Sequence, residues 1–406
     1  MRFDYYSRKI RRLGETVFKD LEHGDVNEKA LSALGIYRPA KVLLPNLRTV
    51  IFEQESTIAL PCAQSIFGPS ITSVCYKGLY PPHHFPLLCS SLLRLSPNIQ
   101  EIRYSCKDLS HPTHPGALFR LIAGLRNLKV IFLSRSNQYV KVPIEHLSGR
   151  AGLRILGCIQ LEHADVPLLS TSIDLKSFFF CADWRTCYSV LDSMRCSWEK
   201  LCFVVRQDPW QMSSLQGFTD RLSQHPSHIS LKYIQLRIDA TLLDGSSTSL
   251  SQALQPLLLC RALRQIELML LPFHTLDDSW LLSVALAWSS LQSLWLEEGP
   301  NSVDTNFSLA GLIPLVKHCP ELRCLTLGLN ARTINPDALY GVDGRNMRSL
   351  CIHRNSTILH PQGVARSLAL LFPKLKSLQF VDGIAGVDDW KQVKKWLEES
   401  AYKKFF

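Results

Sequence analysis

The sequence lacks a secretory leader and an uninterrupted membrane-spanning run. Met1-Arg2-Phe3-Asp4 opens the chain without an apolar segment, which predicts a cytoplasmic or nuclear protein rather than a secreted one. Two long windows are free of charge, but residues 56–76 contain two prolines and residues 279–296 contain five serines. No membrane span is therefore expected. Residues 279–296 instead predict a helix followed by a strand.

Paired-cysteine motifs are also missing. The chain has 13 cysteines, an odd number, and no two of them form a C-x-x-C unit. This pattern favours free thiols in a reducing compartment over disulfides. Zinc binding by Cys181, Cys187, Cys196 and Cys202 is the competing interpretation, but their spacing does not fit a zinc knuckle and Cys202 falls in a predicted strand. The sequence therefore predicts no metal and no cofactor.

The motifs of common catalytic sites are absent from the sequence. It contains no phosphate-binding G-x-x-x-x-G-K-[ST], no G-x-S-x-G, no H-E-x-x-H and no G-x-G-x-x-G after a strand. Asp277 and Asp278 are adjacent carboxylates before an apolar segment, where capping of a helix N-terminus explains them better than acid–base catalysis. We therefore expect a protein that is not an enzyme and acts through its surface.

What the sequence does contain is a recurring L-x-x-L-x-L pattern. Thirteen copies lie between residues 47 and 380, with openings 22 to 33 residues apart. Their mean spacing of roughly 27 residues lies within the leucine-rich-repeat range. The openings are Leu47, Ile71, Ile99, Leu128, Leu153, Leu175, Trp198, Leu231, Leu263, Leu291, Leu322, Met347 and Leu375.

Each copy predicts a helix, a turn and a short strand. The alternating end of the motif is typical of a strand, and apolar residues three and four apart upstream of it, such as Leu309, Leu312 and Val316, indicate a helix. Five prolines, each two residues before an opening, mark the turn: Pro45, Pro69, Pro97, Pro320 and Pro373. The predicted fold class is α/β, a leucine-rich-repeat solenoid of about 13 irregular repeats, with a curved parallel sheet on the concave face and helices outside.

The two ends are predicted to cap the solenoid. Residues 1–40 are assigned to an amphipathic helix over residues 3–21 and a cap, residues 41–384 to the solenoid, and residues 385–406 to a closing helix. Arg8, Lys9, Arg11 and Arg12 lie within the first helix. A nuclear-localisation patch is the alternative interpretation of this basic run.

The chain is basic, with a formal charge of +10. Its commonest basic position is the residue after a strand opening, a set spread over the whole array, so we interpret the excess as solvated repeat surface and expect no nucleic-acid groove. The set comprises Arg48, Lys129, Arg154, Lys176, Lys232, Arg264, Arg323, Arg348 and Lys376.

The concave face can be derived from the alternation of side chains along a strand. The third and fifth positions of each motif are predicted to point away from the core, and the aromatic ones are typical anchors of protein interfaces. The same rule places the small side chains of Ser177, Cys202 and Thr326 on this face. The candidate partner-binding residues for a target protein are Arg103, Phe132, Phe179, Lys200, Tyr233, Glu267 and Trp295.

Several segments resemble one family. Residues 2–13 (RFDYYSRKIRRL), 43–47 (LLPNL), 276–296 and 315–322 resemble F-box and leucine-rich-repeat proteins of mushroom-forming fungi, in the region after the F-box. One departure concerns the asparagine expected eight residues after each opening, which occurs only as Asn330 and Asn355.

The resemblance implies a target receptor of a Skp-cullin-F-box ubiquitin ligase. An F-box opening of the form L-P-x-E-[IL]-[LW] does not precede Arg2, so either the chain is truncated or it is a relative that lost the box. A Skp-type adaptor is expected as a partner only if an F-box lies upstream. The competing hypothesis is a free-standing scaffold or a GTPase regulator, for which Arg103 and Arg237 are the candidate arginines.

Overall fold

The structure of the protein is a computed structural model. The chain forms two compact units, Met1–Cys181 and Ala182–Phe406, which we describe separately. The described residues are 2–13, 42–53, 65–78, 85–106, 113–135, 139–170, 174–206, 210–239, 249–299, 304–332, 342, 344–353, 356–381 and 386–403.

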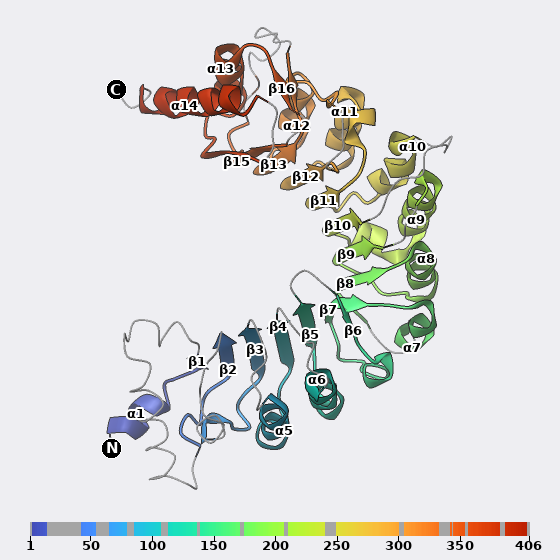
Figure 1. The fold of residues 1–406 in the computed structure, drawn as a ribbon, viewed down its shortest axis with the longest axis vertical. Coiled ribbons are helices and arrows are strands. Elements are labelled where there is room, and N and C mark those ends of the chain that lie inside the picture. Colours follow the sequence, from blue (N-terminus) through green and yellow to red (C-terminus); the bar gives the residue numbers. More distant parts are fainter. Residues whose placement is uncertain are drawn as a thin grey trace. The chain divides into compact units, whose positions relative to one another are not determined.

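The N-terminal unit is a parallel sheet with helices on one side (Figure 1). Its strands follow the order β1-β2-β3-β4-β5-β7-β8, and β6 pairs with β7. The strands are β1 (Arg12–Leu13), β2 (Thr49–Glu53), β3 (Ser73–Gly78), β4 (Glu101–Cys106), β5 (Val130–Arg135), β6 (Val140–Lys141), β7 (Ile155–Gln160) and β8 (Ser177–Ala182). The helices are α1 (Arg2–Ser7), α5 (Phe85–Leu95), α6 (Thr113–Gly124), η1 (Ile144–His146), η2 (His163–Asp165) and α7 (Val166–Ser170).

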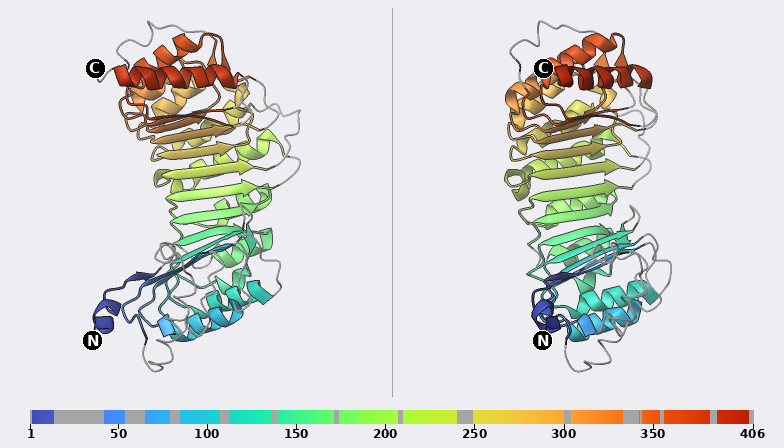
Figure 2. Two further views of the ribbon diagram at one scale, coloured as in Figure 1. Left: turned by 60° about the vertical axis from the view of Figure 1, so that its left-hand side comes forward. Right: turned by 90° about the vertical axis from the view of Figure 1, so that its left-hand side faces the viewer.

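The C-terminal unit repeats this arrangement, and its strands stack as a ladder in Figure 2. The strand order is β9-β10-β11-β12-β13-β15-β17, and β14 pairs with β16 in a small second sheet. The strands are β9 (Lys200–Val205), β10 (Tyr233–Ile238), β11 (Gln265–Met269), β12 (Ser293–Glu297), β13 (Cys324–Leu327), β14 (Asn330–Ala331), β15 (Ser349–Ile352), β16 (Thr357–Ile358) and β17 (Ser377–Phe380). The helices are α8 (Trp184–Ser193), α9 (Met212–Gln224), η3 (Pro226–Ile229), α10 (Leu250–Leu254), η4 (Gln255–Leu259), η5 (Phe273–Thr275), α11 (Asp278–Ala287), α12 (Leu312–His318), α13 (Pro361–Leu371) and α14 (Val387–Lys403).

The predicted leucine-rich-repeat solenoid is confirmed by the strand register. All thirteen openings are followed two residues later by the first residue of a strand. These first residues pair laterally within each unit, as in Tyr233 with Gln265 and Gln265 with Ser293. Twelve of the thirteen opening side chains are buried, and Leu375 is half-buried. Each repeat therefore buries its apolar residues between the sheet and the helices and shares them with its neighbours.

The turns before the strands carry both predicted and unpredicted features. The five prolines all lie in turns and are exposed, as the sequence predicts. The sequence did not reveal that asparagines directly before an opening join successive repeats. Asn98 Nδ2 donates to the Pro69 carbonyl at 2.9 Å, and Asn346 Nδ2 donates to the Pro320 carbonyl at 2.8 Å. Side-chain amides thus satisfy turn carbonyls that the sheet cannot reach.

The prediction of a helix over residues 3–21 is wrong in its extent. The helix α1 ends at Ser7, and Arg12 and Leu13 pair in parallel with Thr49 and Val50. A strand here satisfies the outer backbone groups of β2, which a helix would leave unpaired; residues 14–21 lie outside the described part of the chain. The nuclear-localisation reading of the basic run stays a prediction.

The predicted closing helix is present as α14. Trp390 and Val393 are fully buried, and the helix packs against α13 and β17, so it covers the apolar end of the C-terminal unit. The three-part division at residues 40 and 384 stays a prediction.

Residues 279–296 form α11 and β12, as expected of a helix followed by a strand. In the described ranges, every helix is too short or too polar to cross a membrane.

Candidate functional site

The helix-free side of each sheet, which we call the strand face, carries the predicted partner-binding residues. Arg103, Lys200 and Trp295 are exposed, and Phe132, Phe179, Tyr233 and Glu267 are half-buried. Their orientation toward solvent follows from the alternation along the strands. Whether a partner contacts them stays a prediction.

Three small side chains assigned to this face are buried instead. Ser177, Cys202 and Thr326 are 7%, 1% and 6% exposed. Thr326 lies between Trp295 and Cys351 in the register, and Cys202 interacts with the Tyr233 side chain. A short side chain flanked by larger ones on adjacent strands is covered by them, so the alternation rule predicts direction but not exposure.

An aromatic pair dominates the strand face of the N-terminal unit. Phe132 on β5 and Phe179 on β8 meet edge to face, with ring centroids 5.6 Å apart. The intervening strand β7 places Gly157 opposite Phe132, and a Cβ at Gly157 would lie 2.3 Å from the Phe132 ring. Because Gly157 has no side chain, the Phe132 ring can lie across β7 to reach Phe179.

The neighbours of this pair on the strand face are mainly apolar. Val130 and Ile155 are half-buried and adjacent in the register. Cys158 follows Gly157 at a bulge with a positive φ of 60°, and burial raises the pKa of its thiol to about 11. On β4, Arg103 forms an ion pair with Glu101. The strand face around Phe132 and Phe179 is therefore an apolar surface, and the Arg103–Glu101 ion pair on β4 lies beside it.

The strand face of the C-terminal unit is polar around Glu267. The Glu267 carboxylate accepts a hydrogen bond from Gln235 Nε2 at 2.9 Å, and the Tyr233 hydroxyl is a second hydrogen-bond partner. Burial raises the pKa of Glu267, and the bond with Tyr233 offsets this in part. Burial also moves the pKa of Tyr233 well above its usual range. Both groups are thus ordered, and the tyrosine is a neutral donor at physiological pH.

Trp295 lies beside Glu267 on the next strand. The two residues are register partners between β11 and β12, and Trp295 Nε1 donates to Glu297 Oε2 at 3.1 Å. Trp295 is 38% exposed, whereas Trp198, Trp210, Trp288 and Trp390 are among the largest fully buried side chains. An ordered, exposed indole is the kind of side chain that anchors partners.

The basic residues after each opening lie at one end of the strands rather than on the strand face. In the C-terminal unit Lys232, Arg264 and Arg323 are exposed there, and Lys232 pairs with Glu199 at 2.7 Å. This agrees with the interpretation of the basic excess as solvated repeat surface.

The cysteines and the paired aspartates take structural positions. Cys181, Cys187, Cys196 and Cys202 are buried, and within the described ranges no group of three potential ligands could hold a metal ion. Asp277 caps α11 by accepting hydrogen bonds from the backbone N–H groups of Ser279 and Trp280. The hydrogen bond from the Ser279 hydroxyl, together with these backbone bonds, lowers the pKa of Asp277. Capping therefore accounts for Asp277, as the sequence predicts.

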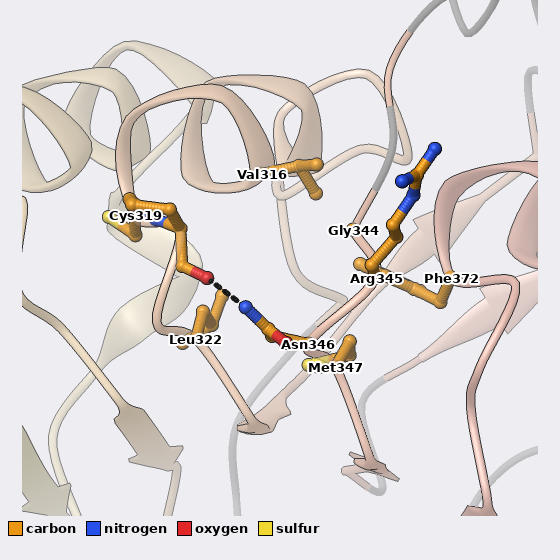
Figure 3. Close-up of a pocket in the computed structure, with 9 residues that line it drawn as sticks. Val316, Cys319, Leu322, Gly344, Arg345, Asn346, Met347 and Phe372 are labelled. Carbon is orange, nitrogen blue, oxygen red and sulfur yellow. Dashed lines mark hydrogen bonds between the residues drawn. The ribbon is translucent and has the colours of Figure 1, made fainter.

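A small cavity lies away from the strand face, between α12 and the turn before β15 (Figure 3). Its volume is about 140 Å³. Burial raises the pKa of the Cys319 thiol to about 12, which disfavours the nucleophilic thiolate form. A Cβ at Gly344 would come within 2.6 Å of the Leu371 carbonyl oxygen, which explains the glycine. The cavity is lined by Val316, Cys319, Pro320, Leu322, Gly344, Arg345, Asn346, Met347 and Phe372.

Comparisons with known proteins find distant similarity to solved structures. No protein-family model and no curated protein matches the chain. A chain in the solved structure described as "Crystal structure of Rad7 and Elc1 complex in yeast" is similar with a TM-score of 0.47 and 11% identity, over 94% of this chain and 90% of that chain. At this TM-score the fold assignment rests on the register and burial of the repeats themselves.

Proposed function

We propose that the protein is a non-enzymatic, protein-binding solenoid that holds a target on its strand face. The observation that carries this proposal is the regular alignment of strand-face side chains on neighbouring strands. Among them, Phe132, Phe179 and Trp295 are held by specific contacts. Rigid aromatic side chains lose little conformational entropy when a partner binds, which makes them effective anchors.

The narrower form of the proposal is a target receptor of an F-box-type ubiquitin ligase. It is supported by the resemblance of residues 2–13, 43–47, 276–296 and 315–322 to the region after the F-box in that family. A Skp-type adaptor would then be a partner only if an F-box lies upstream of Met1.

The competing GTPase-regulator hypothesis needs an exposed arginine at the edge of a repeat. Arg103 pairs with Glu101, and Arg237 pairs with Asp239 at 3.0 Å. Both candidate arginines therefore have an acidic neighbour in the free protein.

The test is quantitative capture of proteins from an extract with variants of each surface. We expect Trp295→Ala to reduce capture of specific partners by about tenfold or more, because central aromatic anchors carry much of the binding energy. Leu282→Ala, which removes an exposed side chain on α11, should leave capture unchanged. Equal capture by both variants would contradict binding at the strand face.

The ubiquitin-ligase link has its own readout. The captured partners should carry ubiquitin when the proteasome is inhibited, and their half-lives should lengthen when this protein is deleted. Partners that bind the strand face with unchanged half-lives would favour the free-standing scaffold.

A further inference from the structure

Four side chains on β11 and β12 form a compact patch around the exposed indole. Glu267 lies opposite Trp295 in the register, and Met269 lies opposite Glu297. All four residues are exposed or half-buried, and they share one face because each pair is two residues apart along its strand. The indole thus has one carboxylate beside it on the next strand and another farther along its own strand.

The hydrogen bonds in this patch fix its geometry. Trp295 Nε1 donates to Glu297 Oε2 at 3.1 Å, which holds the polar edge of the ring. Gln235 Nε2 lies 2.9 Å from Glu267 Oε2 and 3.7 Å from the Met269 sulfur, so this amide positions both β11 side chains. The patch is ordered before any partner binds, which lowers the entropic cost of binding.

Neither carboxylate of the patch is neutralised by a cation from the described part of the chain. The partners of Glu267 are Gln235 and Tyr233, and the partner of Glu297 is Trp295. On the adjacent strand β10, Arg237 is already paired with Asp239. In a chain with a formal charge of +10, this patch is a local region of opposite sign, complementary to a positively charged ligand group.

We propose that Glu267, Trp295 and Glu297 form a subsite for the guanidinium group of an arginine side chain in the bound target, an inference that rests on the proposed protein-binding function. The planar guanidinium stacks on the indole face while its edges donate hydrogen bonds to the carboxylates on two sides of the ring. A lysine ammonium is a compact, strongly hydrated charge and cannot stack and reach both carboxylates with the same directed donors. The arginine is therefore the group that uses all three side chains.

The raised pKa of Glu267 in the free protein agrees with this assignment. Burial without a cationic partner disfavours ionised Glu267, as its raised pKa indicates. An arriving guanidinium would supply the missing counter-charge.

The test is a titration of the full chain with N-acetyl-arginine amide, followed by NMR of the tryptophan indole N–H signals. The chain has eight tryptophans, and Trp295→Phe identifies the signal of interest by its loss. We expect a saturable shift of the Trp295 signal, with binding in the millimolar range because a single side chain makes few contacts. N-acetyl-citrulline amide has nearly the same shape without the charge and should cause no such shift.

Matched variants separate the direct contribution of the two carboxylates to arginine binding from general electrostatic attraction. The double variant Glu267→Gln and Glu297→Gln should weaken arginine binding by about fivefold or more, through loss of two charge-assisted contacts. Glu101→Gln removes a carboxylate on β4 that is already paired with Arg103 and should leave the titration unchanged. An equal response to citrulline, an equal response to N-acetyl-lysine amide, or an unchanged affinity in the double variant would overturn the proposal.

The titration needs no target protein, so its result is independent of the capture experiment. Arginine binding without strand-face capture would count against the proposed function, whereas strand-face capture without arginine binding would count against the subsite.

Discussion

The strand faces of the two units are built on the same register but present different chemistry. In the N-terminal unit, Phe132 and Phe179 form an apolar contact that spans β7. In the C-terminal unit, Trp295 is flanked by Glu267 and Glu297. The repeat pattern fixes which residues face outward, whereas the character of each face is set by the residues between the apolar positions. One architecture therefore presents an apolar surface in one unit and an anionic, aromatic surface in the other.

Among the substitutions that test this difference between the two units, we expect the largest loss of stability at Gly157. Gly157→Ala places a Cβ where the Phe132 ring lies, so the ring must leave its contact with Phe179. We expect a loss of about 1–2 kcal/mol in the free energy of unfolding, measured by chemical denaturation. Gly152→Ala is the matched control, because a Cβ there meets nothing within 4 Å. Equal effects of the two substitutions would contradict the role of Gly157.

A smaller effect should appear in the coupling between Phe132 and Phe179. A double-mutant cycle of the two alanine substitutions should give an interaction energy of about 0.5–1.5 kcal/mol, the range for edge-to-face aromatic pairs. The measurement is the free energy of unfolding of the wild type, both single variants and the double variant. Strictly additive losses would show that the rings do not depend on each other.

The smallest expected effect is a gain in stability when Glu267 is replaced, in contrast to the losses expected at Gly157, Phe132 and Phe179. Its pKa is raised in the folded protein, so the folded state binds more protons above the ordinary pKa of 4.5. Stability is therefore lost as pH rises through the raised pKa. Glu267→Gln removes this penalty and should raise Tm at pH 7 by about 1 °C, since the side chain is only half-buried.

The pH dependence separates this explanation from a general packing effect. The Tm difference between Glu267→Gln and the wild type should vanish below the ordinary pKa of glutamate, where the carboxyl group is protonated in both folded and unfolded states. A variant that is less stable than the wild type at pH 7 would mean that the carboxylate stabilises the free protein.

The sequence was sufficient to predict the repeats and the direction of the side chains. Every opening from Leu47 to Leu375 precedes a strand at the same interval, because burial of one apolar face is a local, periodic requirement. The outward direction of Trp295 and Arg103 followed from the same alternation. Asp277 was recognised as a helix cap because its position before an apolar segment is itself a local signal.

Features that depend on contacts between repeats were not predictable in this way. The helix expected over residues 3–21 gives way to a strand because Arg12 and Leu13 find backbone partners at Thr49 and Val50, which periodicity does not reveal. Cys202 and Thr326 are covered by neighbouring strands. The role of Gly157 depends on two rings from other repeats, and only their positions in space show it.

The most direct test of target binding on the strand face is site-specific photo-crosslinking with a captured partner. A benzophenone amino acid would replace Arg103 or Gln265, which are exposed on the strand face of the two units, or Leu282, which is exposed on α11. We predict crosslinks to the partner from the strand-face positions and none from position 282. Crosslinks from position 282 alone would contradict the account.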